Sequence, residues 1–144
     1  MSKPRVSVII PTFNRGYCLE ESIRSVLQQS FADFELIVVD DGSTDNTSEL
    51  VRRFPAVKLI RLEKNRGVSF ARNRGMAEPE GGCIAFLDSD DLWEKCKLAS
   101  QIKWMECHPD LQAVYTDEIW IRNGVRVNPM NKHRKYSGDI FRYC

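Results

Sequence analysis

The sequence predicts an α/β fold built on an open, mostly parallel sheet with flanking helices and followed by a C-terminal β-hairpin. Three observations support this prediction. Short β-branched runs alternate with helical patterns over residues 6–91, as in parallel strands joined by crossover helices. The length of 144 residues suits one domain, and 42% hydrophobic residues suit a packed core. The pair Asn123-Gly124 lies between two apolar runs, which is a strong hairpin signal.

Five strands are expected where β-branched and other apolar residues cluster. They cover residues 6–10, 34–39, 57–62, 83–87 and 113–115. The run 83–87 is apolar throughout, which is typical of a strand buried on both faces. We therefore expect this strand in the centre of the sheet.

Four helices are expected between and after these strands. Residues 17–29 repeat apolar side chains at helical spacing, and the Ser-Thr-Asp sequence at 43–45 can cap a second helix. A short helix over 67–75 has small residues that allow close packing on the sheet. A fourth helix follows Asp91 and ends at His108-Pro109, because the residue before a proline is disfavoured in a helix. Its buried stripe is formed by Leu98, Ile102 and Met105.

The composition excludes intrinsic disorder and indicates no general affinity for polyanions. Lys and Arg total 21 and Asp and Glu total 20, so a net charge of +1 gives no broad footprint for nucleic acid or an anionic membrane. The five cysteines are an odd number without a CxxC pair, which indicates free thiols in a reducing compartment. The N-terminal apolar run, residues 6–10, is too short for a signal peptide or a membrane span. We therefore expect a cytoplasmic chain without a membrane span or a nucleic-acid partner.

Residues 122–144 differ from the rest of the chain in charge. They carry six basic side chains and one acidic side chain, a local net charge of +5. The chain reaches Cys144 without a capping or terminating pattern, which we interpret as a truncated end. We therefore divide the chain into an α/β domain, residues 1–121, and a basic segment, residues 122–144. This segment is expected to be poorly ordered or to pack against another copy of the chain, so a homo-oligomer is one expectation.

Polar and acidic residues follow three of the predicted strands, where ligands bind in open parallel sheets. These residues are Pro11-Thr12-Phe13-Asn14, Asp40-Asp41-Gly42-Ser43 and Asp88-Ser89-Asp90-Asp91. Five carboxylates at one sheet edge repel each other unless a cation or a hydrogen-bond donor lies among them. The pattern therefore predicts a metal ion or the edge of a nucleobase at this place.

Asp88 and Asp90 are the candidate metal ligands. They are two residues apart at a strand end, so both side chains leave the same face while the chain stays extended, and Ser89 keeps the intervening position small. Carboxylate oxygens without nearby His or Cys favour Mg²⁺ or Mn²⁺, which complete their shells with phosphate and water. The alternative is that Asp90 or Asp91 caps a helix that begins at Leu92.

Four motifs in order resemble family 2 glycosyltransferases. They are Val6-Ser7-Val8-Ile9-Ile10-Pro11-Thr12-Phe13-Asn14, Val38-Val39-Asp40-Asp41-Gly42-Ser43-Thr44-Asp45, Asn65-Arg66-Gly67 with Ala71-Arg72-Asn73-Arg74-Gly75, and Asp88-Ser89-Asp90-Asp91. The resemblance covers residues 5 to about 121. It implies a glycosyltransferase A-type, Rossmann-like fold that binds a nucleotide-sugar and transfers the sugar with inversion to an acceptor hydroxyl. The acceptor would be a saccharide or a lipid-linked molecule, bound by a region beyond residues 122–144.

The resemblance also assigns roles in the nucleoside pocket. Pro11, Thr12 and Phe13 would line the base and ribose site. Asp41 would accept a hydrogen bond from the N3–H of uracil or thymine, which favours a uridine- or thymidine-diphosphate sugar. Asp40 would share that role or hold the loop.

For the phosphates, the resemblance implies nucleotide contacts at Asp88 and Ser89, with Asp88 at the ribose or a metal-bound water and Asp90 as the direct metal ligand. Arg72 is a candidate diphosphate or base contact, since a guanidinium forms two bonds to an oxyanion. The alternative for Arg72 is an exposed helix cation paired with an acid.

The catalytic base has no convincing match between Asp91 and Cys144. Inverting members that resemble this chain use an Asp or Glu in a downstream acidic motif, whereas Asp117, Glu118 and Asp139 are more simply loop or hairpin residues. We therefore expect the base to be missing from this chain. A parent protein could be membrane-peripheral.

Three other functions were weighed against this one. A dinucleotide-binding oxidoreductase needs a GxGxxG cradle, which the first turn, Pro11-Thr12-Phe13-Asn14, does not provide. A phosphoryl-transfer domain with an aspartyl nucleophile leaves Asp40-Asp41 unexplained. A nucleotide-sugar-binding module without transferase activity remains the serious alternative, because the base is absent.

Overall fold

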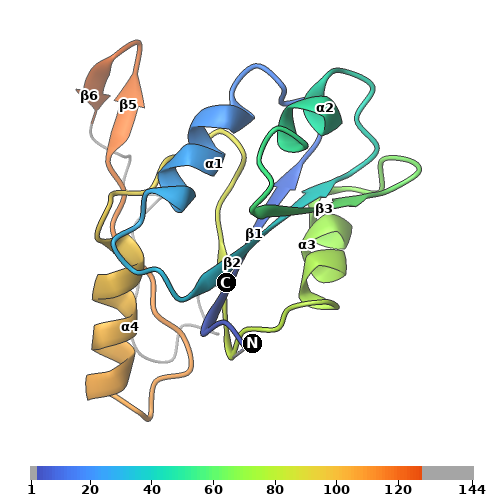
Figure 1. Cartoon of the computed structure of the whole chain (residues 1–144). Helices are drawn as coiled ribbons and strands as arrows, with labels where there is room; N and C mark the ends of the chain where they lie inside the picture. Colours follow the sequence, from blue (N-terminus) through green and yellow to red (C-terminus); the bar gives the residue numbers. More distant parts are fainter. Residues whose placement is uncertain (1–2, 128–144) are drawn as a thin grey trace. The chain divides into compact units, whose positions relative to one another are not determined.

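The fold is described from a computed structural model, which describes residues 3–127. Its elements in chain order are β1 (Val6–Thr12), α1 (Leu19–Leu27), β2 (Phe34–Asp40), α2 (Thr47–Val51), β3 (Val57–Arg61), α3 (Val68–Met76), β4 (Cys83–Phe86), α4 (Lys97–Cys107), β5 (Trp120–Arg122) and β6 (Val125–Val127) (Figure 1). The chain divides into two units, Met1–Gln112 and Ala113–Cys144. The predicted division at residue 121 stays a prediction.

The first unit is organised by a four-stranded sheet in the order β3-β2-β1-β4. All three strand pairs are parallel, which confirms the predicted sheet type. At the carboxyl end, Thr12 lies opposite Asp40, and Asp40 lies opposite Arg61. The register therefore brings the residues that follow β1 and β2 to one edge of the sheet.

Helices cover both faces of this sheet (Figure 1). The larger core contains Val8 and Ile10 of β1 and the buried stripes of α1 and α4. Alternate strand residues point to the other face, where Ile9 and Ile37 pack with Ala71 of α3. The sheet is thus a central layer, and its loops at the carboxyl edge are held by packed helices on each side.

The approach of α3 to the sheet depends on Gly75. A Cβ atom at this position would lie 2.6 Å from Ile9 Cγ2 and 3.2 Å from Val39 Cγ2. Contacts this short cannot be accommodated by a buried, close-packed side chain without displacement of the helix. This confirms that small residues allow close packing here.

The predicted central position of β4 is wrong for the sheet that the described residues form. β1 has a neighbour on each side and is buried at all seven positions, whereas β4 pairs only with β1. Ile84 and Phe86 are 42% and 41% exposed, so one face of β4 is only partly covered by residues 3–127. An apolar sequence therefore did not distinguish a strand with two neighbours from one with a single neighbour.

The fourth helix begins later than predicted, at Lys97 rather than directly after Asp91. Polar side chains of α1 and of Gln29, which follows this helix, bind the intervening backbone instead. The Ser22 hydroxyl, with one proton to share, lies 3.0 and 2.8 Å from the carbonyl oxygens of Ser89 and Asp91, and Gln29 Nε2 donates to that of Glu94 at 2.8 Å. These hydrogen bonds satisfy backbone carbonyl groups of the segment without a helix. Because no helix begins at Leu92, the alternative that Asp90 or Asp91 caps a helix there is wrong. The predicted end at His108 is confirmed.

The second unit contains the predicted hairpin, in which β5 and β6 pair antiparallel. Asn123 and Gly124 have φ values of 51° and 75°, the positive angles that a two-residue hairpin turn of this type needs. The predicted strand over 113–115 is wrong, since residues 113–119 are not assigned to a strand in the described part of the chain. The predicted disorder or self-association of the basic segment concerns residues that lie largely outside the described part.

Two further predictions concern the whole chain. Within residues 3–127, no helix is long and apolar enough to cross a membrane. The four described cysteines, Cys18, Cys83, Cys96 and Cys107, are free thiols, as predicted, and Cys144 lies outside the described residues.

Candidate active site

The end of β1 supplies Pro11, Thr12 and Phe13 to the carboxyl edge of the sheet. Pro11 and Thr12 are buried, whereas Phe13 is 40% exposed. The Thr12 carbonyl oxygen accepts the backbone N–H of Asp41 at 2.8 Å, which joins the ends of β1 and β2. Thr12 Oγ1 is buried and has no hydrogen-bond partner within residues 3–127. A buried hydroxyl without a partner is costly, so this atom is suited to contact a ligand.

Asp40 is fully buried and serves the loop between β2 and α2. Its carboxylate accepts the backbone N–H of Ser43 at 2.9 Å and the hydroxyl of Ser48, and Arg61 Nε lies 3.9 Å away. Sequence analysis left open whether Asp40 shares in base binding or holds the loop. These contacts favour the loop-holding role.

Asp41 is 2% exposed, and its carboxylate faces the loop after β3. One oxygen accepts the backbone N–H of Arg66 at 2.9 Å and the other accepts that of Gly67 at 2.7 Å. The next residue, Gly42, has a φ of 75°, and a Cβ atom there would lie 2.6 Å from the carbonyl carbon of Lys64. The Asp-Gly pair therefore lets this loop close over the end of β2.

Side chains of the loop after β1 bind the loop after β2. Asn14 has a φ of 52°, accepts the backbone N–H of Thr44 on Oδ1 at 2.8 Å, and donates its own N–H to Ser43 Oγ at 2.8 Å. Asp45 Oδ2 accepts the N–H of Gly16 at 3.1 Å. Burial raises the pKa of Asp45, but hydrogen bonds from Thr47 and Gly16 outweigh it and hold the pKa below its usual value. Sequence analysis missed these links, although Asn tolerates positive φ and so signals a tight turn.

Arginines lie against both candidate metal ligands that follow β4. Arg72 Nη2 donates to Asp88 Oδ1 at 2.6 Å, and Arg15 Nη2 lies 3.7 Å from Asp90 Oδ2. Arg72 Nε is buried without a partner in the described part of the chain. The alternative for Arg72 was an exposed helix cation paired with an acid. Arg72 is paired with an acid, but this acid is Asp88 of the candidate site. Sequence analysis missed Arg15.

Ser89 lies between the two carboxylates and is 7% exposed. Its carbonyl oxygen accepts hydrogen bonds from Ser22 Oγ at 3.0 Å and from Cys18 Sγ at 3.5 Å. Burial raises the pKa of the Cys18 thiol, so the sulfur remains protonated and acts as a donor here. The backbone between Asp88 and Asp90 is therefore fixed from α1.

The acidic edge has internal donors that offset carboxylate repulsion. Backbone N–H groups bind Asp40 and Asp41, and arginines pair with Asp88 and Asp90. Among residues 3–127 no group of three or more His, Cys, Asp or Glu side chains could hold a metal ion. Two exposed carboxylates on one short segment still fit Mg²⁺ or Mn²⁺, because these ions take one or two protein carboxylates and complete their shells with phosphate and water.

The candidate catalytic bases lie apart from this edge in the chain. Glu118 and Asp117 belong to the second unit, where Glu118 Oε2 accepts the indole N–H of Trp120 at 2.9 Å. Asp139 lies outside the described residues. The carboxylates and arginines described above at the carboxyl edge all belong to the first unit.

A parallel sheet with polar and acidic loops at its carboxyl edge defines the class of open α/β proteins that bind ligands at this edge, and comparison with known proteins identifies the family. Residues 7–141 match the family model for glycosyl transferase family 2, and the chain belongs to this family. WfgD of Escherichia coli, a UDP-Glc:alpha-D-GlcNAc-diphosphoundecaprenol beta-1,3-glucosyltransferase, is 44% identical over 102 residues, which are 69% of this chain and 40% of WfgD.

Solved structures agree with this assignment. TarS 1–349 of S. aureus in complex with UDP-GlcNAc superposes with a TM-score of 0.70 and 34% identity over 73% of this chain and 32% of that one. The mannosyltransferase PcManGT of Pyrobaculum calidifontis, in complex with GDP-Man and Mn²⁺, gives a TM-score of 0.67 and 33% identity. The match covers 73% of this chain and 33% of PcManGT. The predicted glycosyltransferase A-type fold is confirmed. The chain spans 42% of TuaG of Bacillus subtilis (strain 168) and 40% of WfgD, less than half of either relative.

Proposed function

We propose that this chain forms the donor-binding part of an inverting glycosyltransferase. The donor is a uridine- or thymidine-diphosphate sugar, and the acceptor is a hydroxyl of a saccharide or lipid-linked molecule. The observation that carries the proposal is the Asp88-Ser89-Asp90 segment with its paired arginines at the carboxyl edge of the sheet. A charged leaving group at this edge meets both cationic side chains and carboxylates that attract a divalent ion. Beside them, Thr12 and Phe13 offer an unpartnered hydroxyl and an exposed ring for the nucleoside.

Asp41 is proposed to select the base. An ionised carboxylate only accepts hydrogen bonds, and each of its oxygens retains a lone pair beyond the backbone N–H that it binds here. It can therefore accept the N3–H of uracil or thymine, but it would face the unprotonated N3 of cytosine. The neighbouring TarS 1–349 structure with UDP-GlcNAc supports a uracil-containing donor.

We expect uridine or thymidine diphosphate to bind about tenfold tighter than cytidine diphosphate, since one charge-assisted hydrogen bond distinguishes the bases. Asp41→Asn should narrow this gap, because an amide can offer a donor to cytosine. Isothermal titration calorimetry with the three nucleotides measures both effects. Equal affinity of the unaltered chain for cytidine diphosphate would assign Asp41 to loop support alone.

Asp88 and Asp90 are proposed to hold Mg²⁺ or Mn²⁺, and the Mn²⁺ in the PcManGT complex supports this use of a divalent ion. A divalent ion bound with the donor would stabilise the charge that develops on the departing diphosphate. Arg72 is placed to share that charge, because a guanidinium that pairs with Asp88 can turn its remaining N–H groups to phosphate.

Calorimetry with uridine diphosphate should show at least about tenfold tighter binding with Mn²⁺ than with chelator, as expected for an ion that bridges carboxylate and phosphate. Asp90→Ala should remove most of this difference, while Asp110→Ala, a change at an exposed aspartate of the same unit, should retain it. Equal affinities of the unaltered chain in both conditions would refute the metal assignment and leave base selection at Asp41 untouched.

The acceptor is proposed with support from the same comparison. WfgD, by its name, acts on a diphosphoundecaprenol-linked sugar, which supports a lipid-linked acceptor for this chain and a membrane-peripheral parent protein. The cytoplasmic location stays a proposal from the sequence. The alternative, a nucleotide-sugar-binding module without transferase activity, is supported by the lack of a matched base and shares every donor contact above. A turnover assay therefore separates these two functions, whereas binding does not.

A further inference from the structure

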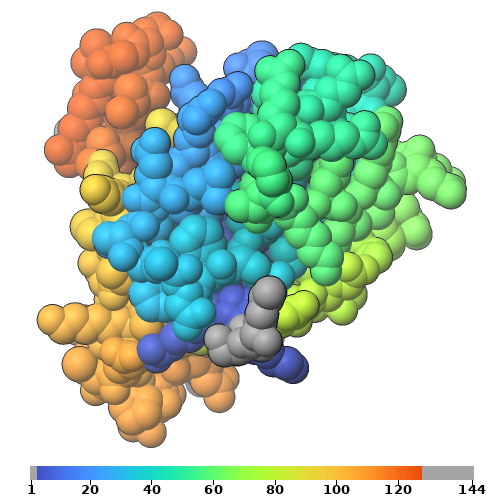
Figure 2. All heavy atoms as spheres, viewed as in Figure 1, coloured from blue at the N-terminus to red at the C-terminus, as the bar shows by residue number. Residues whose placement is uncertain are grey.

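A basic groove lies between the edge strand β3, the loop that follows it and α3. It is a hollow of about 330 Å³ whose lining includes four cations, Arg61, Lys64, Arg66 and Arg74, and one carboxylate, Glu63, a net charge of +3. Figure 2 shows the green segments that contain β3 and α3 at the surface of the molecule. We call this hollow the β3–α3 groove. A local charge of this size contrasts with the chain's overall charge of +1.

Two of these cations have no anionic partner within residues 3–127. Lys64 and Arg66 are exposed, and their side chains make no ion pair or hydrogen bond there. The Arg66 guanidinium lies 3.7 Å from the centroid of the Phe70 ring, which orients it by a cation–π contact. Such a contact uses the face of the guanidinium and leaves its N–H groups available to an anion.

The third cation, Arg74, is only partly neutralised. It pairs with Glu78, whose other oxygen lies 3.2 Å from Lys58 Nζ. Hydrogen bonds from Arg74 and Lys58 lower the pKa of Glu78, so this single carboxylate stays ionised between two cations. One unit of positive charge therefore remains on this side of the groove.

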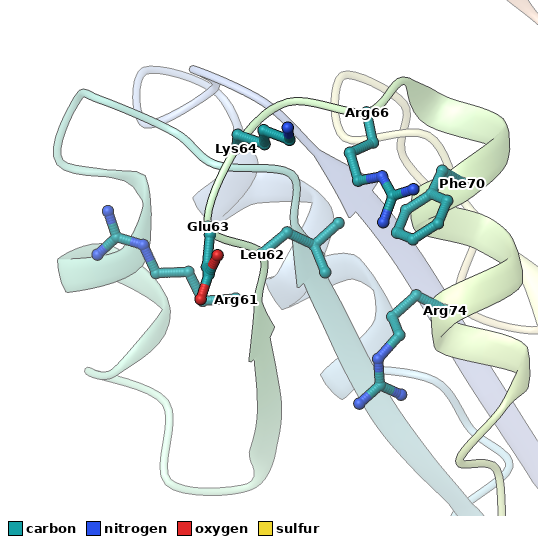
Figure 3. Close-up of a pocket in the computed structure, with 7 residues that line it drawn as sticks. All are labelled: Arg61, Leu62, Glu63, Lys64, Arg66, Phe70 and Arg74. Carbon is teal, nitrogen blue, oxygen red and sulfur yellow. The ribbon is translucent and has the colours of Figure 1, made fainter.

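The groove also has an apolar part. Figure 3 shows Lys64, Arg66 and Arg74 around Leu62, with Phe70 beside Arg66, whereas Arg61 and Glu63 extend away from Phe70. Arg61 binds the carbonyl oxygen of Ser43 at 3.1 Å and lies near Asp40, so it serves the loop after β2. The surface that remains joins three cations to an aliphatic and an aromatic side chain.

The β3–α3 groove is separate from the donor edge. The backbone N–H of Arg66 binds Asp41, while the Arg66 side chain turns to Phe70. On α3, Arg72 pairs with Asp88 at the donor edge, whereas Arg74 lines the groove. Positions two apart on a helix point in different directions, so Arg72 and Arg74 do not share one site.

We propose that the β3–α3 groove binds a phosphate ester as a second anion site. Arginine forks match phosphate oxygens, and Lys64 adds a point charge. Leu62 and Phe70 receive the non-phosphate part of the ester. A nucleic acid fits less well, because the net charge of +1 gives the chain no broad basic footprint. Two sources share this chemistry, a soluble phosphate ester and the head group of an anionic phospholipid.

The test uses the full chain in a chelating buffer, which suppresses metal-dependent binding at the donor edge. The soluble probe is phenyl phosphate, followed by calorimetry, and the lipid probe is a vesicle of phosphatidylglycerol in phosphatidylcholine, compared with phosphatidylcholine alone in a flotation assay. The double variant R66A/R74A should weaken binding by about tenfold or more, since it removes two charge-assisted contacts. The matched control R52A/R53A removes two exposed arginines elsewhere in the same unit.

If R66A/R74A weakens the binding of phenyl phosphate, the ligand is a soluble ester. If the chain binds only anionic vesicles and R66A/R74A weakens that binding, the ligand is a lipid head group. Absence of binding to both probes overturns the proposal, as does equal weakening by R52A/R53A. Loss of binding in Arg72→Ala with retention in R66A/R74A would place the anion at the donor edge and also overturn it. Thermal melts report folding, and Lys64→Ala, a change at an exposed loop residue, repeats the test if the double variant is unfolded. The result does not depend on nucleotide-sugar transfer.

Discussion

Replacement of Asp40 by alanine is expected to lower the free energy of unfolding by about 3 kcal/mol, because it leaves two buried donors without an acceptor at about 1–3 kcal/mol each. The Asp40 side chain is fully buried between the N–H of Ser43 and the hydroxyl of Ser48. Arg61 contributes less, since its guanidinium is 3.9 Å away and its side chain is 51% exposed. The loop after β2 would lose the group around which it turns.

Urea unfolding followed by circular dichroism measures this effect, with Asp33→Ala as the control. Asp33 is exposed, so its replacement should change the free energy of unfolding by no more than about 0.5 kcal/mol. Asp40→Asn should lower the free energy of unfolding by an amount between those of Asp40→Ala and Asp33→Ala, because an amide retains one acceptor oxygen. A cost for Asp40→Ala as small as that of the control would contradict the loop-holding role. Nucleotide binding by the folded fraction of Asp40→Asn would then have to be tested for a direct contact.

The sheet and its helices were predictable because each depends on a local pattern. β-branched runs gave the strands of the first unit, and Asn123-Gly124 gave the hairpin, since only residues that tolerate positive φ suit its turn. The position of β4 was not predictable. Its sequence is apolar, but whether an apolar strand has one neighbour or two depends on other parts of the chain.

The start of α4 shows a second limit. Residues 92–96 carry no strong helix breaker, and their backbone is held outside a helix by Ser25 of α1 and by Gln29, which follows α1. Ser22 of α1 holds the preceding residue, Asp91, in the same way. Such contacts join residues more than 60 positions apart in the chain, and no local pattern records them. Tertiary hydrogen bonds decided between two locally acceptable conformations.

At the candidate site, the sequence located the edge but not the pairings. The residues that follow β1, β2 and β4 could be assigned from strand ends alone. Arg15 could not be assigned to the site in this way, because its approach to Asp90 depends on how the loop after β1 turns. Asp40 and Asp41 are neighbours of the same type in the sequence, yet one binds the loop after β2 and the other binds the loop after β3.

The chain is expected to bind a nucleotide-sugar but to transfer little or no sugar. The proposed donor site uses the ends of β1, β2 and β4, all of which the first unit contains. Transfer also needs a base that deprotonates the acceptor hydroxyl, and we predict that none of the carboxylates after Asp91 serves as this base. General-base catalysis typically contributes about 10²–10⁴-fold, so its absence should leave at most slow hydrolysis of the donor.

A turnover assay over a panel of nucleotide-sugars with simple hydroxyl acceptors measures transfer and hydrolysis separately, with WfgD and its own lipid-linked acceptor as the positive control. Uridine diphosphate binding by the same sample shows that the donor part is folded, so a lack of turnover cannot be attributed to unfolded chain. Slow hydrolysis that Asp90→Ala reduces would support a donor-binding part that awaits a base. Robust transfer that is lost on replacement of Asp117, Glu118 or Asp139 by alanine would identify that residue as the base, because removal of a general base lowers turnover while donor affinity persists. The chain would then hold donor site and base together, and the binding-module alternative would be excluded.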